Sequence, residues 1–136
     1  MTDKRLFILL ADDDPEDMEL LEEVIMNVRP GTDVKQFTNG KEILDFLDDC
    51  HDNALPNLII LDYNMPEMNG AEILSTLESI GRFQPIPKLV LSTSNAEAYV
   101  NECLKNGAAG YFVKPSNMKA LEMLTSEMIS LSSQLT

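Results

Sequence analysis

Residues 6–15 read LFILLADDDP, an apolar run that ends abruptly in three aspartates and a proline. A short and continuous apolar run such as 6–11 is typical of a strand that is covered on both faces of a parallel sheet. Asp14 is a favoured helix N-cap, and Pro15 suits the first turn of a helix. The stretch therefore predicts a buried strand that leads directly into a helix.

The same alternation continues along the chain. Apolar residues at helical spacing follow each strand-like run, and Ser116 is expected to cap the last helix. The further strands are expected at residues 34–37, 58–61, 87–91 and 111–113. Five strand and helix pairs predict an α/β fold: a flavodoxin-like, doubly wound parallel sheet with strand order 2-1-3-4-5 and helices on both faces.

Length and charge limit what the chain does. With 136 residues there is room for one core, so residues 1–136 are expected to form a single domain. The net charge of −13 opposes binding to nucleic acid or to anionic membranes. No signal-peptide pattern opens the chain, and no apolar run reaches the roughly 18 residues of a membrane span. A cytoplasmic location is therefore expected.

The histidine and cysteine content disfavours metal and redox sites that are built from these residues. His51 is the only histidine, which argues against a multi-histidine metal site. Cys50 and Cys103 lack the close spacing of a zinc or redox site and are expected to be buried thiols.

Polar side chains follow four of the five expected strands. Because the carboxyl ends of parallel strands meet at one edge of the sheet, these side chains are expected to converge there. They are Asp12 and Asp13 after the first strand, Asp62 after the third, Ser92 at the fourth and Lys114 after the fifth. Carboxylates in such a group repel one another, so a hard divalent cation such as Mg²⁺ is expected among them.

Four short motifs appear in a fixed order at these strand ends. Residues 10–13 read LADD, 61–70 read LDYNMPEMNG, 92–93 read ST and 110–115 read GYFVKP. Taken together over essentially the whole chain, they resemble the receiver domains of two-component response regulators.

The resemblance implies a phosphorelay role for the acidic cluster. Asp62 would accept a phosphoryl group from a sensor histidine kinase or a histidine phosphotransfer protein. Asp13, Asp62 and the backbone carbonyl of Asn64 would hold Mg²⁺, and Asp12 would orient its waters. The metal would neutralise charge during transfer.

The resemblance also implies a signalling switch. Lys114 and Ser92 would contact the phosphate, and Ser92 with Tyr111 would change conformation. The change would reach a protein target through the face of the fourth helix, fifth strand and fifth helix; whether that face also forms a homodimer stays open. Such a domain would catalyse only its own phosphorylation and dephosphorylation. Pro115 leaves open the cis Lys-Pro bond that is common in the family.

Alternatives remain at this point. A haloacid dehalogenase-type, Mg²⁺-dependent phosphohydrolase also uses a strand-end aspartate, but its signature maps onto Asp12, Asp14 and Glu16, where Thr or Val is expected in the last position. A receiver relic that serves only as a scaffold usually lacks the acceptor or the lysine, and both are present. Within receivers, residues 12–17 and 91–94 look more like single-domain regulators that partner phytochrome-type and other hybrid kinases than like the chemotaxis motor regulator.

Overall fold

Strand β1 (Phe7–Ala11) lies between β2 (Asp33–Phe37) and β3 (Leu58–Leu61), and the sheet continues through β4 (Lys88–Ser92) to β5 (Gly110–Val113). The computed structural model describes residues 5–135. All four pairings between neighbouring strands are parallel. The predicted strand order 2-1-3-4-5 is therefore confirmed.

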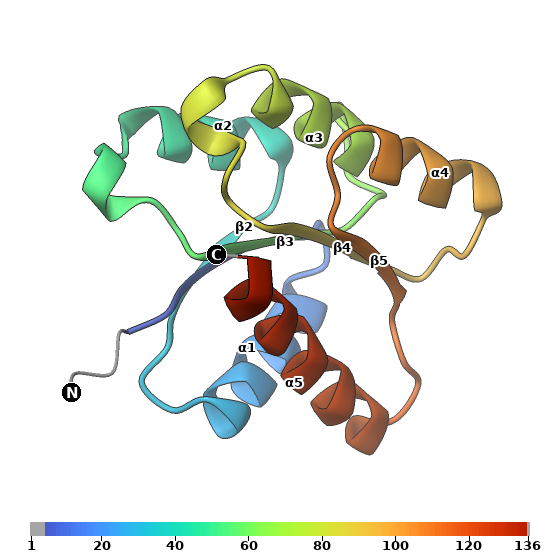
Figure 1. Cartoon of the computed structure of the whole chain (residues 1–136). Helices are drawn as coiled ribbons and strands as arrows, with labels where there is room; N and C mark the ends of the chain where they lie inside the picture. Colours follow the sequence, from blue (N-terminus) through green and yellow to red (C-terminus); the bar gives the residue numbers. More distant parts are fainter. Residues whose placement is uncertain (1–4, 136) are drawn as a thin grey trace.

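Helices cover both faces of this sheet (Figure 1). Helices α1 (Pro15–Val28) and α5 (Met118–Leu135) lie on one face. The other face carries α2 (Gly40–Asp49), α3 (Gly70–Glu78) and α4 (Glu97–Lys105). Two short 3-10 turns, η1 (Asp52–Ala54) and η2 (Gly81–Phe83), complete the second layer. Among the described helices, none is long and apolar enough to cross a membrane.

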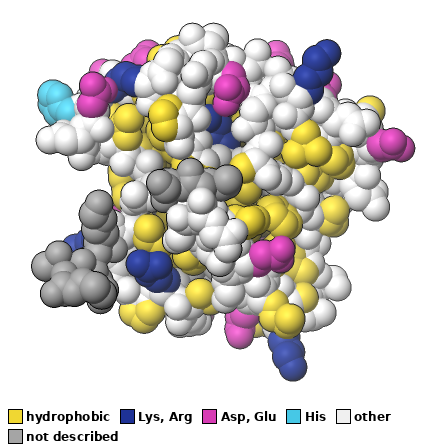
Figure 2. Space-filling model, in the orientation of Figure 1, with side chains coloured by type: hydrophobic (Ala, Val, Ile, Leu, Met, Phe, Trp, Pro, Cys, Tyr) yellow, Lys and Arg dark blue, Asp and Glu magenta, His cyan; other side chains and the backbone are white. Residues whose placement is uncertain are grey.

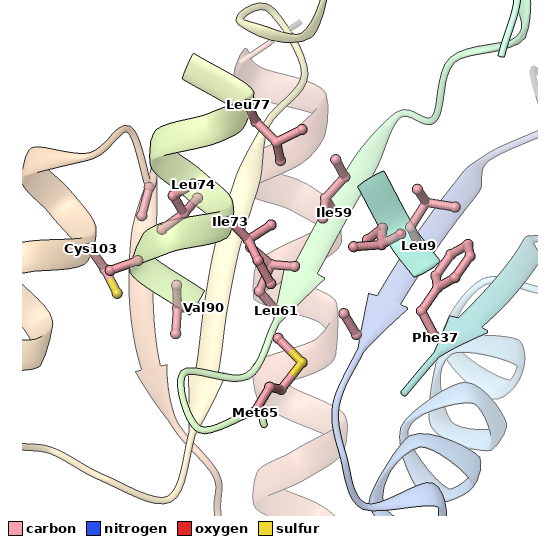
Figure 3. Packing of buried hydrophobic residues seen from close by; sticks show 14 of the residues in the cluster. Leu9, Phe37, Ile59, Leu61, Met65, Ile73, Leu74, Leu77, Val90 and Cys103 are labelled. Atoms are coloured by element: carbon pink, nitrogen blue, oxygen red, sulfur yellow. The ribbon is translucent and has the colours of Figure 1, made fainter. Parts of the chain in front are cut away.

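The three inner strands, β1, β3 and β4, are buried on both faces because successive side chains point to opposite layers. Leu9, Ile59 and Leu61 pack into the cluster beneath α2 and α3, where Figure 3 shows them facing side chains of α3 such as Ile73 and Leu77. The alternate residues form the second cluster, against α1 and α5; those of β1 and β3 are Ile8, Leu10, Leu58 and Ile60. Fully burying one such side chain contributes about 1.5 to 3 kcal/mol. The two clusters fix the sheet between its helical layers.

The helix caps follow the sequence with one exception. Asp14 caps α1, where its carboxylate accepts hydrogen bonds from the backbone N–H groups of Glu16 and Asp17. For α5 the prediction was wrong by one residue. Asn117 stands directly before the helix and accepts from the N–H of Ala120 at 2.8 Å, so Ser116 is not needed there.

The two cysteines differ in burial. Cys103 is fully buried, as predicted, whereas Cys50 is only half-buried because it stands at the C-terminal end of α2. Both are free thiols.

Arg82 of η2 holds the C-terminal end of α2. Its guanidinium donates to the backbone carbonyls of Leu47, Asp48 and Cys50 at 2.9, 3.1 and 2.7 Å, and it pairs with the carboxylate of Asp52. The last carbonyls of a helix have no partner within the helix. We expect Arg82→Met to lower the free energy of unfolding by about 2 kcal/mol, measured by urea denaturation.

A matched control for Arg82→Met is Lys41→Met. Lys41 pairs with Asp45 at 2.6 Å, but both side chains are exposed and neither caps a helix end. We expect no measurable change in the urea midpoint for this variant. Equal losses for both variants would contradict the capping role of Arg82.

Candidate functional site

Backbone hydrogen bonds carry the sheet one residue past its strand ends. The N–H of Asp62 donates to the carbonyl of Ala11 at 2.8 Å, and the N–H of Lys114 donates to the carbonyl of Ser92 at 2.8 Å. These bonds fix the residues that follow β3 and β5 relative to their neighbours. The predicted convergence at the carboxyl edge of the sheet is thus a direct result of the strand register.

Three carboxylates meet at this edge. Asp12, Asp13 and Asp62 each offer an oxygen, and these oxygens all lie within 4.8 Å of one another. Asp12 and Asp62 are buried, whereas Asp13 is exposed. Oxygen ligands on one open side are the donor set that a hard divalent cation requires. Asp14 serves as the cap of α1, as expected.

The ammonium of Lys114 lies among the carboxylates. It donates to Asp12 at 2.7 Å, to Asp17 at 2.9 Å and to Asp62 at 3.4 Å. Burial alone would lower the pKa of Lys114, but the hydrogen bonds to Asp12 and Asp17 and the nearby negative charges outweigh it and raise the pKa. Lys114 is therefore a fixed positive charge at the centre of the site. The peptide bonds of the described residues are all trans, including the bond from Lys114 to Pro115.

The surroundings of Asp62 disfavour its ionised form. Burial and the neighbouring charge of Asp12 raise the pKa of Asp62 to about 6, and Lys114 offsets only part of this. One weak hydrogen bond, from the N–H of Asn64 at 3.4 Å, also reaches its carboxylate. An additional positive charge next to Asp62 would stabilise its ionised form.

The loop after β3 is shaped by a close backbone approach. A Cβ atom on Gly70 would lie 2.8 Å from the carbonyl oxygen of Asp62 and 3.0 Å from the Cα of Tyr63. Gly70 also donates its N–H to the carbonyl of Tyr63 at 2.8 Å. The loop folds back tightly on the residue that precedes it, and Asn64 lies exposed at its start.

Ser92 and Tyr111 lie around the loop between β4 and α4. The side chain of Ser92 is fully buried, and its hydroxyl accepts from the N–H of Ser94 at 3.3 Å. The phenol of Tyr111 donates to the carbonyl of Ser94 at 2.7 Å. Burial raises the pKa of Tyr111, so it stays a hydrogen-bond donor. Ser92 and Tyr111, the two residues predicted to change conformation, therefore both form a hydrogen bond with Ser94.

Sequence reasoning missed two contacts at this edge. The contact of Asp17 with Lys114 was not predicted, although the place of Asp17 in the first turn after Asp14 puts it beside the strand ends. Tyr63 stacks on Tyr99 of α4, with ring centroids 4.1 Å apart and 13° between the planes. Its phenol donates to Glu102 at 3.3 Å. No spacing pattern links Tyr63 and Tyr99, because helix packing alone brings them together.

Comparisons with known proteins agree with this geometry. Residues 8–125, which run from within β1 to within α5, match the family model of the response regulator receiver domain. The two-component response regulator ARR8 of Arabidopsis thaliana is 30% identical over 143 residues, covering 94% of this chain and 63% of that protein. The response regulator ORR4 of Oryza sativa subsp. indica is 29% identical, covering 98% and 63%. The chain thus spans less than two thirds of the length of these relatives.

Solved structures of similar proteins share the fold. The phosphorylated cyanobacterial phytochrome response regulator RcpA superposes with a TM-score of 0.86 at 26% identity, covering 98% of this chain and 97% of that one. The Mn²⁺-bound form of response regulator Rcp1 gives a TM-score of 0.80 at 29% identity, covering 92% of each chain. Neither the family match nor these proteins support the phosphohydrolase alternative.

Proposed function

Because the chain belongs to the response regulator receiver domain family of two-component systems, we propose that Asp62 is its phosphoacceptor and that phosphorylation switches its signalling state. One observation carries the proposal. The carboxylates of Asp12, Asp13 and Asp62 lie within 4.8 Å of one another, and the ammonium of Lys114 lies among them. One lysine and three carboxylates at the same sheet edge suit a site that binds a divalent cation and a phosphoryl group.

The phosphoryl group would come from a phosphohistidine of a sensor histidine kinase or a histidine phosphotransfer protein. An oxygen of Asp62 attacks phosphorus, the P–N bond breaks, and the imidazole leaves with the bonding electron pair and takes up a proton. The product is an acyl phosphate on Asp62. The similarity to a phytochrome response regulator supports a phytochrome-type or other hybrid kinase as the donor.

The donor set fits a divalent cation, and we propose Mg²⁺. Asp13, Asp62 and the backbone carbonyl of Asn64 would hold it, while Asp12 would orient its waters. When bound, the ion neutralises negative charge that builds up during phosphoryl transfer. Exposed Asp13 leaves one side of the cluster open to solvent, as a partly hydrated ion requires.

Lys114 and Ser92 would stabilise the phosphorylated state. The ammonium of Lys114 would pair with a phosphoryl oxygen, and the hydroxyl of Ser92 would donate to another. A movement of the Ser92 hydroxyl would change its hydrogen bond with the N–H of Ser94, whose carbonyl also accepts from the phenol of Tyr111. Phosphorylation would in this way favour one arrangement of the loop between β4 and α4.

The signal would leave through the face formed by α4, β5 and α5. Leu104, Val113 and Met118 of these elements are exposed although they are apolar. Figure 2 shows hydrophobic side chains gathered at the surface between α4 and α5. We propose that a downstream protein, or a second copy of the chain, docks here. The net charge of −13 disfavours nucleic acid and anionic lipid as partners. We propose that the chain itself acts in the cytoplasm.

We propose that residues 1–136 act as one receiver domain that catalyses only its own phosphorylation and dephosphorylation. The test is to incubate the chain with phosphoramidate and Mg²⁺ and to measure its intact mass. We expect a gain of one phosphoryl group, and no gain when EDTA removes the metal. Borohydride reduction of the acyl phosphate should then leave homoserine at position 62.

Three results would contradict the proposal. The first is homoserine at another aspartate, and the second is no phosphoryl gain with Mg²⁺. The third is repeated turnover of a small phosphomonoester, which a receiver domain would not show.

A further inference from the structure

The ammonium of Lys114 already has one carboxylate acceptor for each of its N–H donors. A lysine ammonium has three N–H donors and no acceptor. In this structure they face the carboxylates of Asp12, Asp17 and Asp62. A phosphoryl oxygen on Asp62 would be a further acceptor for these three donors, so it would compete with the partners that Lys114 has in this structure.

The three partners differ in how easily they can be released. Asp12 is buried, and its other carboxylate oxygen accepts from the N–H of Asp14 at 2.9 Å, so it is held in place. Asp62 would itself carry the phosphoryl group. The side chain of Asp17 is 43% exposed, whereas that of Asp12 is 10% exposed. Water can therefore replace the ammonium at Asp17 at the lowest cost.

The position of Asp17 is set by the fold. It lies in the first turn of α1, and its backbone N–H is held by the capping carboxylate of Asp14. Asp17 and Lys114 line a pocket between α1, the sheet and α5 together with Asp12 and Asp62, and its remaining walls are apolar side chains such as Met18 and Leu121. Among these residues, Asp17 is the polar contact that α1 provides to the ammonium.

We propose that Asp17 is a positioning residue that competes with the phosphoryl group on Asp62 for the ammonium of Lys114. The inference rests on the proposed function. In the unphosphorylated chain, Asp17 draws the ammonium toward α1. In the phosphorylated chain, that hydrogen bond is given up. Asp17 thus weakens the phosphorylated state relative to the unphosphorylated one.

The test uses beryllofluoride, which stands in for the phosphoryl group, at saturating Mg²⁺. We expect Asp17→Asn to bind beryllofluoride about 3- to 10-fold more tightly than the unsubstituted chain, measured by titration. Glu16→Gln is the matched control. It removes the same charge from the same helical turn, but no polar contact joins Glu16 to Lys114 among the described residues. We expect its affinity to change by less than about 2-fold.

A double-mutant cycle separates competition from a general charge effect. If Asp17 acts through Lys114, adding Asp17→Asn to the Lys114→Ala variant should change its beryllofluoride affinity by less than about 2-fold. The same gain in both backgrounds would overturn the inference, because charge alone would then explain it. Weaker binding by Asp17→Asn would also overturn it, since Asp17 would then orient Lys114 in the bound state.

The failure of this inference can be told from failure of the proposed function. Equal beryllofluoride affinity for the unsubstituted chain and Asp17→Asn would overturn the competition alone. Absence of beryllofluoride binding to the unsubstituted chain at saturating Mg²⁺ would overturn the proposed function and, with it, this inference.

Discussion

Replacing Asp62 with asparagine is expected to abolish phosphoryl gain and, in metal-free buffer at neutral pH, to raise the free energy of unfolding by about 2 to 3 kcal/mol. Phosphoryl gain is measured by intact mass and stability by urea denaturation. The amide of asparagine is a poor nucleophile, so the chemistry stops. Because the two effects have opposite signs, damage to the fold cannot produce both.

The stability gain follows from the surroundings of Asp62. Its side chain is buried, and its carboxylate lies within 4.8 Å of those of Asp12 and Asp13. The nearest cation, Lys114, is closer to Asp12 than to Asp62. An asparagine of nearly the same size removes the charge without leaving a cavity. The raised pKa of Asp62, about 6 instead of 3.8, has the same origin.

The difference between the two proteins should depend on pH. The folded-state pKa of Asp62 is above its unfolded value, so the folded chain binds more protons between about pH 4 and pH 6. The stability that this proton provides is complete below the unfolded pKa and is lost as the pH rises through the folded pKa. The advantage of Asp62→Asn should therefore be small near pH 4 and reach its full size above about pH 7.

Asp13→Asn is the control for this measurement. It belongs to the same cluster but is exposed, so solvent screens its charge and the gain in stability should be clearly smaller. If Asp62→Asn were less stable than the unsubstituted chain at neutral pH, its pairing with Lys114 would outweigh the repulsion, and our electrostatic account would be wrong.

Gly70→Ala is expected to lower the free energy of unfolding by about 2 to 3 kcal/mol, measured by urea denaturation. The new Cβ would lie 2.8 Å from the carbonyl oxygen of Asp62 and 3.0 Å from the Cα of Tyr63. Both are backbone atoms, so no side-chain rotation relieves the contact. Any adjustment must move the backbone at Asp62, and we expect beryllofluoride affinity to fall as well.

Gly81→Ala provides the comparison. No atom lies within 4 Å of the Cβ that alanine would add at this position, and its φ is not in the left-handed region. Stability should be unchanged or slightly increased, because alanine restricts the unfolded chain. Similar losses at Gly70 and Gly81 would show that the close approach to Asp62 is not the cause.

Much of the fold was predictable because its inner strands are buried on both faces. The run at 58–61 is entirely apolar, and all four of its residues are buried in β3. Asp14 and Pro15 marked the start of α1 by local geometry alone. Ser116 and Asn117 are both good capping residues. The choice between them depends on where the chain turns after β5, which the sequence does not show.

The site was predictable to the extent that strand register decides it. Asp12, Asp62 and Lys114 directly follow strands of one parallel sheet, so the sheet must bring them to the same edge. Asp17 contacts Lys114 across 97 positions of sequence, and that contact depends on how α1 packs beside the sheet. Arg82 likewise reaches α2 only after the layers have assembled. Contacts between layers were therefore missed, while contacts within the sheet edge were not.

The stacked rings of Tyr63 and Tyr99 give the protein an optical reporter of its own. The chain has three tyrosines and no tryptophan. The ring of Tyr63 follows Asp62, that of Tyr99 belongs to α4, and the phenol of Tyr111 donates a hydrogen bond to the loop before α4. Intrinsic emission and near-ultraviolet circular dichroism therefore arise mainly from this single region, and the unlabelled protein can be followed spectroscopically while it switches.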